Sequence, residues 1–468
     1  MRLWIPVRVT PAHGVGGGME RVSWSMARGL AARGHDVTVV TTAHPDGRAQ
    51  EIDQGVRVHY LAGSTWRRYQ RRWWQASYRL LEAEHSADPY DAILSQSAGG
   101  RPYLARARRR LGVPSVVVLH GSARGEVRTA GRGARSPRGV YRLARLGWRL
   151  PRQVAGWRRA AGSVDRWLAV SPEVAADNAR ELGIERGRMA VVPVGTDTGA
   201  FRPRAGTERS PARLRLGLPA GAEVVVLVTR LEREKGAQVA LEAVRILAGT
   251  HPDLHLLVAG TGRHEARLRR TASRLGLDDR CRFLGLVDHA DLPEILAAAD
   301  VFVLPSLCAE GRPAAVVEAL AAGLPVVATR SAGTTGLVVD GVTGRLVPPG
   351  DTGALVEAIA GLLADGPRRR AMGRRAREHA LRWWTEDSMI DAVEAALLGA
   401  VTAPRPGGGP APGREPTAPG AVAAPRPGDR PAPGRSPTAL DAVAAPRPGD
   451  GPAPGREPTA LDAGAPGS

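Results

Sequence analysis

The sequence predicts an α/β protein with two doubly wound parallel sheets and a C-terminal tail that lacks a packed core. Three observations lead to this prediction. Short apolar strands alternate with helical patterns through residues 1–197, and the same alternation restarts in residues 222–382. A stretch rich in Pro, Arg and Gly, residues 198–221, lies between them and indicates a linker. The length of 468 residues is sufficient for two separate cores.

The expected strands are short runs rich in Val, Leu and Ile between turn residues. They lie at 3–10, 37–42, 56–61, 91–96, 115–119, 166–170, 223–229, 254–259, 281–284, 300–304 and 325–328. Helical periodicity predicts helices that include 19–33, 73–85, 352–363, 367–382 and 386–399. Ser171 and Pro172 are typical of a further helix start, as N-cap and first helical residue. The last helix, within residues 383–400, is expected to return to the first domain.

Residues 401–468 differ in composition from the rest of the chain. A segment rich in Pro, Ala and Gly recurs every 21 residues, as Pro404, Pro425 and Pro446 show. The tail has no aromatic residues and almost no large aliphatic ones, so it cannot bury enough surface to offset the entropy of ordering. We therefore expect a disordered, polyproline-like tail with no catalytic role.

The composition limits the cellular context. Cys281 and Cys308 are too few for a disulfide framework and no metal-ligand spacing occurs, which predicts a reducing, cytoplasmic compartment. The opening residues are typical of a strand rather than a signal peptide, and no apolar run reaches the roughly 18 residues that span a bilayer. The formal net charge of +19 favours an anionic partner: nucleic acid, a membrane or a phosphorylated substrate.

Two glutamates follow the predicted strand at 300–304. Glu310 lies on the loop after that strand, and Glu318 lies on the second turn of the small-residue helix that follows. Open α/β sheets bind ligands beyond the carboxyl ends of their strands. Two carboxylates in that position can accept hydrogen bonds from the hydroxyls of a polyol. The alternative, a loop carboxylate and a solvated helical glutamate, is disfavoured by the flanking strands, glycines and prolines.

A second strand end carries two cations, Arg230 and Lys235. Of the 65 basic residues, 64 are arginine and Lys235 is the single lysine. Arg230 follows the strand at 223–229 and Lys235 precedes a helix, so two cations and a helix N-terminus converge where a diphosphate can bind. Arginine serves generic surface positions in this chain, so the lone lysine favours a functional role over an exposed ion pair.

The block from Glu310 to Thr329, E-G-R-P-A-A-V-V-E-A-L-A-A-G-L-P-V-V-A-T, resembles the signature of the retaining, nucleotide-sugar-dependent glycosyltransferases of family 4, which have the GT-B fold. Further matches extend over residues 1 to about 399. The resemblance implies two facing Rossmann-like domains, an acceptor-side domain first and a donor-nucleotide-binding domain second. It also implies transfer of a sugar to an acceptor hydroxyl with retention of configuration, in the synthesis of a cell-envelope glycan, a glycolipid or a small-molecule glycoside.

The resemblance assigns roles to individual residues. Arg230 and Lys235 would stabilise negative charge on the departing diphosphate. Glu310 would hold sugar hydroxyls, and Glu318 the ribose hydroxyls. His120, in V-V-V-L-H-G, matches the family's donor-site histidine, although a histidine at a strand end is more often a surface residue.

Several glycines match the family's loops near the donor, where backbone approaches ligand closely. Each is equally consistent with a simple turn, apart from the one that follows Glu310. These candidates are Gly16, Gly17, Gly18, Gly260, Gly262 and Gly311.

The chain departs from the family pattern at a few positions. Val194 stands where the family commonly has asparagine, and Gly336 replaces a glutamate. These departures keep open a degenerate, sugar-binding relative. No Asp-x-Asp triad occurs, so we expect a metal-independent reaction without a cofactor, with a UDP-sugar or a GDP-sugar as donor substrate.

Residues 101–160 contain 16 arginines and one acid, Glu126. Arginines recur at every third or fourth position from Arg135 to Arg152, with aliphatic residues between them, and aromatic residues lie upstream in 66–74. A basic amphipathic helix with interfacial aromatics indicates docking on an anionic membrane, with a lipid-linked acceptor and a peripheral location on the inner face. An ordinary solvated arginine face is the alternative.

Other functions remain to be weighed. A phosphorylase or a sugar-nucleotide epimerase would use the same fold for different chemistry. A basic nucleic-acid-binding protein is the non-enzymatic alternative, but the arginine run lacks a motif that places side chains on base edges, so no nucleic-acid partner is expected.

Overall fold

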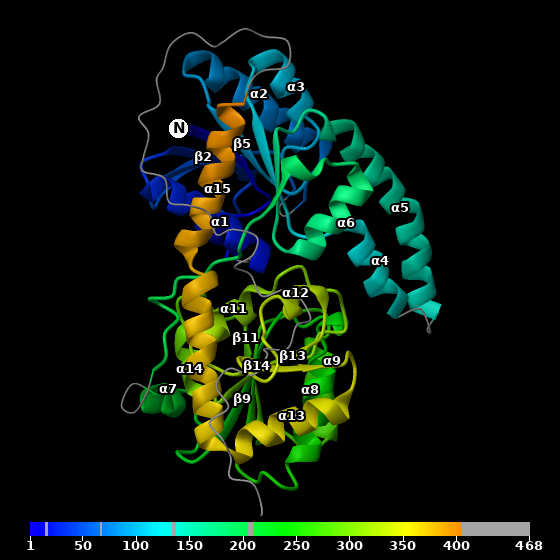
Figure 1. The fold of residues 1–468 in the computed structure, drawn as a ribbon, viewed down its shortest axis with the longest axis vertical. Coiled ribbons are helices and arrows are strands. Elements are labelled where there is room, and N and C mark those ends of the chain that lie inside the picture. Colours follow the sequence, from blue (N-terminus) through cyan, green and yellow to red (C-terminus); the bar gives the residue numbers. More distant parts are fainter. Residues whose placement is uncertain (15–16, 66–67, 133–136, 205–208, 404–468) are drawn as a thin grey trace, which may run out of the picture. The chain divides into compact units, whose positions relative to one another are not determined.

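The computed structural model describes residues 1–14, 17–65, 68–132, 137–204 and 209–403. In these residues the chain forms a sheet of eight strands and a sheet of six, with helices packed around each (Figure 1). Each sheet has its own hydrophobic core. The predicted α/β class is confirmed, and we call the two parts the first and the second lobe. The predicted disordered tail lies, from residue 404 onward, outside the described residues.

The sheet of the first lobe has the strand order β3-β4-β2-β1-β5-β6-β7-β8. All neighbours pair in parallel except β3 with β4, which are antiparallel. Its strands are β1 (Arg2–Pro6), β2 (Asp36–Thr42), β3 (Gln50–Asp53), β4 (Val56–Leu61), β5 (Ala92–Gln96), β6 (Ser115–Leu119), β7 (Arg166–Ala169) and β8 (Met189–Val191). Every residue of β5 and β6 is buried, as expected for central parallel strands covered on both faces.

Helices cover this sheet, and one of them begins and ends at clear capping residues. They are α1 (Gly18–Ala32), α2 (Arg71–Ala87), α3 (Leu104–Leu111), α4 (Ala123–Arg132), α5 (Pro137–Ala161) and α6 (Pro172–Leu182), with single turns at Pro11–His13 and Arg186–Arg188. The predicted start of α6 is confirmed, because Ser171 Oγ accepts a bond from Val174 N at 3.2 Å. Gly183, with φ of 70°, ends the helix in the left-handed conformation that glycine favours.

The sheet of the second lobe is entirely parallel, in the order β11-β10-β9-β12-β13-β14. Its strands are β9 (Glu223–Val228), β10 (Leu254–Ala259), β11 (Cys281–Gly285), β12 (Val301–Leu304), β13 (Val326–Thr329) and β14 (Gly344–Val347). Its helices are α7 (Arg209–Arg215), α8 (Ala237–Leu247), α9 (Glu265–Arg274), α10 (Leu292–Ala298), α11 (Ala314–Ala321), α12 (Ala332–Thr335), α13 (Thr352–Ala364) and α14 (Gly366–Trp383). Each fully buried aliphatic side chain in this core stabilises it by about 1.5–3 kcal/mol.

The chain crosses between the lobes twice, and the two crossing segments are hydrogen-bonded to each other. Thr196 N donates to Trp384 O, and Glu386 N donates to Thr196 O, both at 3.0 Å. A Cβ on Gly195 would lie 2.1 Å from Thr385 O, so only glycine permits this approach. After the second crossing, α15 (Glu386–Val401) packs its apolar residues into the core of the first lobe. The last helix therefore lies with the first lobe.

The structure differs from the sequence prediction at short elements. The strands β3, β8 and β14 were not predicted, because three or four residues carry too little periodicity to be recognised. The segment predicted as a linker contains α7, and Phe201 in it is fully buried in the core of the second lobe. Those residues belong to the second lobe rather than to a free connection.

Candidate active site

Two loops at the carboxyl ends of neighbouring strands bring Lys235 and Glu310 together. Lys235 ends a single helical turn after β9, and Glu310 lies on the loop after β12. Gly236 has φ of 76°, and a Cβ there would lie 1.8 Å from Pro305 O. The backbone beside Lys235 therefore packs directly on the end of β12, and only glycine fits at this point.

The two side chains form a buried ion pair. Lys235 Nζ lies 2.8 Å from both Oε1 and Oε2 of Glu310, and their side chains are 16% and 8% exposed. Ser306 Oγ, itself fully buried, donates to Glu310 Oε1 at 2.5 Å, and Cys308 Sγ lies 3.6 Å from the same oxygen. Oε1 is thus saturated, whereas Oε2 has Lys235 as its single hydrogen-bond donor among the described residues.

Both members of the pair stay charged around neutral pH. Burial alone would lower the pKa of Lys235, but the Glu310 carboxylate outweighs it and raises that pKa. Burial would likewise raise the pKa of Glu310, but the charge and hydrogen bonds of Lys235, with the Ser306 bond, lower it. Burial, with the Glu310 charge, raises the pKa of Cys308 to about 12, so that thiol remains protonated.

Arg230 lies beside this pair on the surface. It is exposed, and its charge acts on Lys235, where it opposes, less strongly than burial does, the carboxylate that raises the pKa of the ammonium group. Arg230 has no ion-pair partner among the residues that the structure describes. A free guanidinium next to a partly neutralised lysine, at the start of α8, leaves net positive charge where an anion can bind.

Glu318 lies on α11 and is 3% exposed. Its Oε1 accepts a hydrogen bond from His289 Nε2 at 2.9 Å. Its Oε2 is buried and, among the described residues, has no hydrogen-bond partner. A buried carboxylate oxygen without a donor is costly, so it fits a site whose ligand supplies hydroxyl groups.

His120 follows β6 in the first lobe. Its Nε2 lies 3.0 Å from Gln96 Oε1, so Nε2 donates and Nδ1 remains an acceptor. Burial lowers the pKa of His120 to about 4, although the Glu20 carboxylate opposes this, so the ring is neutral at pH 7. A Cβ on Gly311 would lie 2.4 Å from His120 O. His120 and the residue after Glu310 are therefore in direct backbone contact.

The remaining candidate glycines serve close packing within the loops. A Cβ would lie 2.0 Å from Thr229 O at Gly260 and 2.4 Å from Leu231 O at Gly262, so both glycines pack on the backbone that carries Arg230. Gly17 N donates to Glu20 Oε2 at 3.1 Å at the start of α1, and Gly18 begins that helix. Gly16 lies outside the described residues.

The first lobe contains a pocket that was not predicted from the sequence. It has a volume of about 200 Å³ and is lined by residues that include Arg8, Glu20, Tyr69, Gln96 and Ser97. Arg8 Nη2 donates to Glu20 Oε1, and Gln96 also contacts His120, which places the pocket beside the candidate histidine. Gln96 is the last residue of β5 and Ser97 follows it, so the rule that ligands bind at carboxyl ends of strands would have identified both residues.

The described residues contain neither a candidate metal site nor a candidate membrane-spanning helix. No cluster of three or more His, Cys, Asp and Glu side chains there could hold a metal ion. Within the same residues, no helix combines the length and apolarity needed to cross a bilayer.

Over most of its length, the chain is similar to known glycosyltransferases. The family profile described as Glycosyltransferase Family 4 matches residues 16–200, and the profile Glycosyl transferases group 1 matches residues 209–379. The chain is 32% identical over 415 residues to D-inositol 3-phosphate glycosyltransferase 2 of Catenulispora acidiphila, covering 83% of this chain and 92% of that protein. It is 30% identical over 415 residues to D-inositol 3-phosphate glycosyltransferase of Segniliparus rotundus, covering 84% and 88%.

Solved structures show the same fold. Sucrose-phosphate synthase from Thermosynechococcus elongatus superposes with a TM-score of 0.70 at 24% identity, covering 84% of this chain and 97% of that one. Anabaena HepE in complex with UDP-glucose superposes with a TM-score of 0.66 at 21% identity, covering 85% and 100%.

Proposed function

Because the chain belongs to the family 4 glycosyltransferases and has the GT-B fold, we propose that it transfers a sugar from a nucleoside diphosphate sugar to a hydroxyl of a small polar acceptor, with retention of configuration. The bond from the anomeric carbon to the diphosphate oxygen breaks, a bond from that carbon to the acceptor oxygen forms, and the acceptor proton is released. The observation that carries this proposal is the buried Lys235–Glu310 pair beside the unpaired, exposed Arg230.

Arg230 and Lys235 bind the diphosphate. Two of the three N–H bonds of Lys235 point to Glu310, which leaves one for a phosphate oxygen. Arg230 is exposed and can bind two oxygens at once. As the bond to the sugar breaks, negative charge grows on the diphosphate, and two cations already in place stabilise that charge more than the ground state.

Glu310 orients the sugar. Its Oε1 is saturated by Lys235, Ser306 and Cys308, but Oε2 retains capacity to accept a sugar hydroxyl. Because the carboxylate stays ionised, the bond it accepts is charge-assisted and strong. Glu318 binds the ribose hydroxyls through its buried, unpartnered Oε2, and His289 holds the other oxygen in place.

The acceptor binds in the pocket of the first lobe, next to His120. Apolar residues form most of the lining of that pocket, and the Arg8–Glu20 pair adds polar groups that together are nearly neutral in charge and can bind the hydroxyls of a small acceptor. Burial opposes the charge of Glu20, but Arg8 outweighs it and lowers the Glu20 pKa, so the carboxylate is available to a hydroxyl. Two relatives are named D-inositol 3-phosphate glycosyltransferases, so cyclitols and their phosphates are the first acceptors to test. Envelope glycans and glycolipids remain the wider product class.

The test is release of nucleoside diphosphate from a panel of UDP- and GDP-sugars, with and without inositol, inositol 3-phosphate and simple glycosides. We expect one donor to be consumed faster when an acceptor is present, and proton NMR of the product to show the anomeric configuration of the donor. Release that depends on inorganic phosphate would instead identify a phosphorylase. Conversion of the sugar nucleotide without any acceptor would identify an epimerase. Either result would overturn the proposal.

We also propose that the outward face of α5 docks on an anionic membrane. The opposite face packs Leu146, Leu150 and Trp157 against the protein. Tyr141 and Trp148 are 68% and 67% exposed and lie on the outward face at helical spacing. The guanidinium of Arg152 stacks 3.9 Å from the Trp148 ring. Aromatic rings beside arginines suit the headgroup layer of a membrane.

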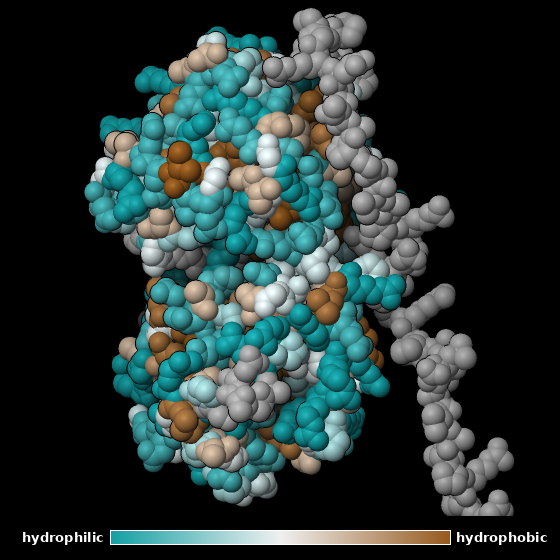
Figure 2. Space-filling model, turned by 90° about the vertical axis from the view of Figure 1, so that its left-hand side faces the viewer, coloured by the Kyte–Doolittle hydropathy of each residue, from teal (hydrophilic) through white to brown (hydrophobic). Residues whose placement is uncertain are grey.

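Most arginines described on this face lack acidic partners. Among the described residues, Arg145, Arg152 and Arg159 have no ion pair with a carboxylate, whereas Arg149 pairs with Glu126. On the face drawn in Figure 2, hydrophobic residues are scattered in small groups among hydrophilic ones, as is usual on protein surfaces that face water. Exposed aromatic residues aligned with unpaired arginines on α5 differ from that pattern and indicate a docking surface.

A vesicle co-sedimentation assay tests this surface. The protein should pellet with vesicles of phosphatidylcholine and phosphatidylglycerol, not with phosphatidylcholine alone, and high salt should release it. The variant with Tyr141→Ala and Trp148→Ala should stay in solution, whereas Arg374→Gln with Arg375→Gln, on the exposed face of α14, should still pellet. Equal sedimentation of all variants, or binding to RNA in preference to vesicles, would contradict the proposal.

A further inference from the structure

We propose that Thr129, on α4 in the first lobe, is a positioning residue that holds the catalytic loop of the second lobe in register through Ala309. Ala309 N donates to Thr129 Oγ1 at 3.0 Å, and Ala309 immediately precedes Glu310. The inference rests on the proposed role of Glu310 as the group that orients the donor sugar.

The Thr129 hydroxyl is itself oriented for this contact. It donates its proton to Gly125 O, one turn earlier in α4, at 2.9 Å. The proton position is therefore set, and a lone pair of Oγ1 is directed to the Ala309 N–H. On the other side of Glu310, Gly311 packs against His120 O. The residues before and after Glu310 are thus both in contact with the segment from His120 to Thr129.

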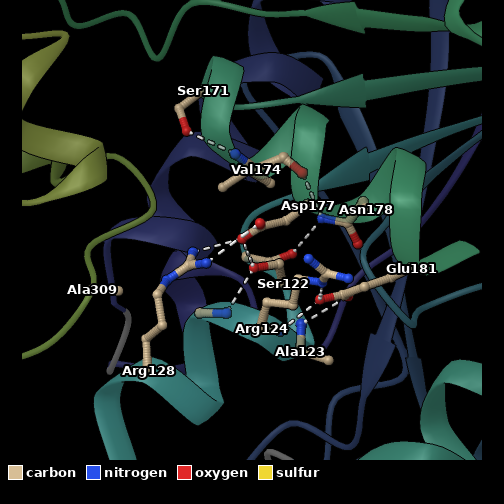
Figure 3. Close-up of polar contacts among 12 residues, drawn as sticks. Ser122, Ala123, Arg124, Arg128, Ser171, Val174, Asp177, Asn178, Glu181 and Ala309 are labelled. Atoms are coloured by element: carbon tan, nitrogen blue, oxygen red, sulfur yellow. Dashed lines mark hydrogen bonds and ion pairs between the residues drawn. The ribbon is translucent and has the colours of Figure 1, made fainter. Parts of the chain in front are cut away.

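The start of α4 is held by carboxylates of α6 (Figure 3). Ala123 N and Arg124 N donate to Glu181 at 3.1 and 2.6 Å, and Ser122 Oγ donates to Asp177 Oδ2 at 2.7 Å. Asp177 and Glu181 are 6% and 8% exposed. These bonds satisfy N–H groups that a helix start otherwise leaves open, so α4 is anchored to α6 at its first turn.

A further hydrogen bond ties the next turn of α4 to the same helix. Arg128 Nη2 donates to Asp177 Oδ2 at 2.6 Å, as Figure 3 shows. Burial would raise the pKa of Asp177, but Arg128 and Ser122 outweigh it and lower the pKa, so the carboxylate is ionised at neutral pH. Thr129 follows Arg128 directly. The hydroxyl that meets Ala309 therefore projects from a helix that cannot shift without breaking charged hydrogen bonds.

If Thr129 positions Glu310, its loss should affect the enzyme differently from a general loss of stability. The nucleotide contacts Arg230, Lys235 and Glu318, all in the second lobe, so loss of Thr129 should leave nucleotide affinity unchanged. The sugar is oriented by Glu310, so the same loss should reduce turnover. A merely structural role would alter melting temperature and nucleotide binding together.

The experiment compares Thr129→Val, which keeps shape but removes the hydroxyl, with Thr129→Ser, which keeps the hydroxyl. Thr129→Ala is a second variant that lacks the hydroxyl, and alanine is well tolerated in a helix. Thr402→Val is the matched control, because Thr402 Oγ1 makes the same bond to a carbonyl four residues earlier, Leu398 O at 2.9 Å, and contacts no other element within the described part of the chain. Each variant is measured for kcat with the donor found by the panel, for the Kd of UDP or GDP, and for Tm.

We expect Thr129→Val and Thr129→Ala to lower kcat about tenfold, the effect of one lost buried hydrogen bond, with the nucleotide Kd within about twofold of wild type. Thr129→Ser and Thr402→Val should retain wild-type kcat. Wild-type kcat in either deletion variant, or a deletion that weakens nucleotide binding as much as it slows turnover, would overturn the inference. A wild-type protein that consumes no nucleotide sugar would instead refute the proposed function on which the inference rests.

Discussion

Removal of Lys235, first alone and then together with the charge of Glu310, should separate the effect of the ion pair on stability from its effect on catalysis. In the single variant Lys235→Met the Glu310 carboxylate stays buried and loses its cation, with Ser306 and Cys308 as the remaining donors. Breaking a buried ion pair in this way costs about 3–5 kcal/mol. For a lobe of this size, that loss lowers Tm by about 6–20 °C. Turnover should fall by at least about 10³-fold, because charge on the leaving group loses a preorganised donor.

The double variant, Lys235→Met with Glu310→Gln, removes both charges and keeps similar volumes. Replacement of a whole buried pair by neutral groups is often neutral in stability, so most of the lost Tm should return. Activity should not return, since the diphosphate and the sugar each lose a contact. Arg233→Met is the matched control, because Arg233 is an exposed residue on the same turn. Calorimetry and the nucleotide-release assay measure the two effects.

The pH dependence has a defined sign. The lowered pKa of Glu310 gives stability that is present above its ordinary value of 4.5 and is lost as pH falls through the lowered value. The raised pKa of Lys235 gives stability that is present below 10.5 and is lost as pH rises through the raised value. The single variant should therefore be most destabilised between these limits and approach wild type in acid. A Lys235→Met protein with wild-type Tm and turnover at pH 7 would refute this reasoning.

Three further predictions concern neighbouring residues. Glu318→Gln should weaken binding of UDP or GDP about tenfold in calorimetric titration, through loss of a charged hydrogen bond to the ribose, and unchanged affinity would contradict that assignment. Gly311→Ala should reduce turnover by at least about tenfold, because a Cβ at Gly311 would lie 2.4 Å from His120 O, whereas Gly361→Ala, at an exposed position of α13 where no described atom lies within 4 Å of the added Cβ, should not. Activity should survive EDTA, since the cations Arg230 and Lys235 neutralise the diphosphate. A loss of turnover in EDTA that Mg²⁺ or Mn²⁺ restores would disprove this metal-independent reaction.

The parts of the site that the sequence predicts are those tied to strand ends. Lys235 was identified because it is the single lysine in an arginine-rich chain, and Glu310 because it follows a buried strand. Their direct contact was not predicted, because no periodicity links residues that lie 75 positions apart. The sequence assigned each residue to a different part of the donor, and the structure shows that they also bind each other.

Contacts between elements distant in sequence account for the other omissions. The bond from Ala309 to Thr129 joins residues 180 positions apart, and Thr129 is an ordinary helical residue in its own segment. The pocket around Arg8 and Gln96 likewise forms from several separate segments. Val194, which departs from the family pattern, is 1% exposed within the apolar core of the first lobe. Its replacement of a polar residue is compatible with its surroundings, because a buried polar group there would need a partner.

The most direct test of the account is the structure of the protein bound to a non-transferable analogue of its nucleotide sugar. The account predicts diphosphate oxygens within hydrogen-bond distance of Arg230 and of Lys235 Nζ, and a sugar hydroxyl donating to Glu310 Oε2. An analogue bound with its diphosphate away from both cations, or with its sugar turned away from Glu310, would contradict it.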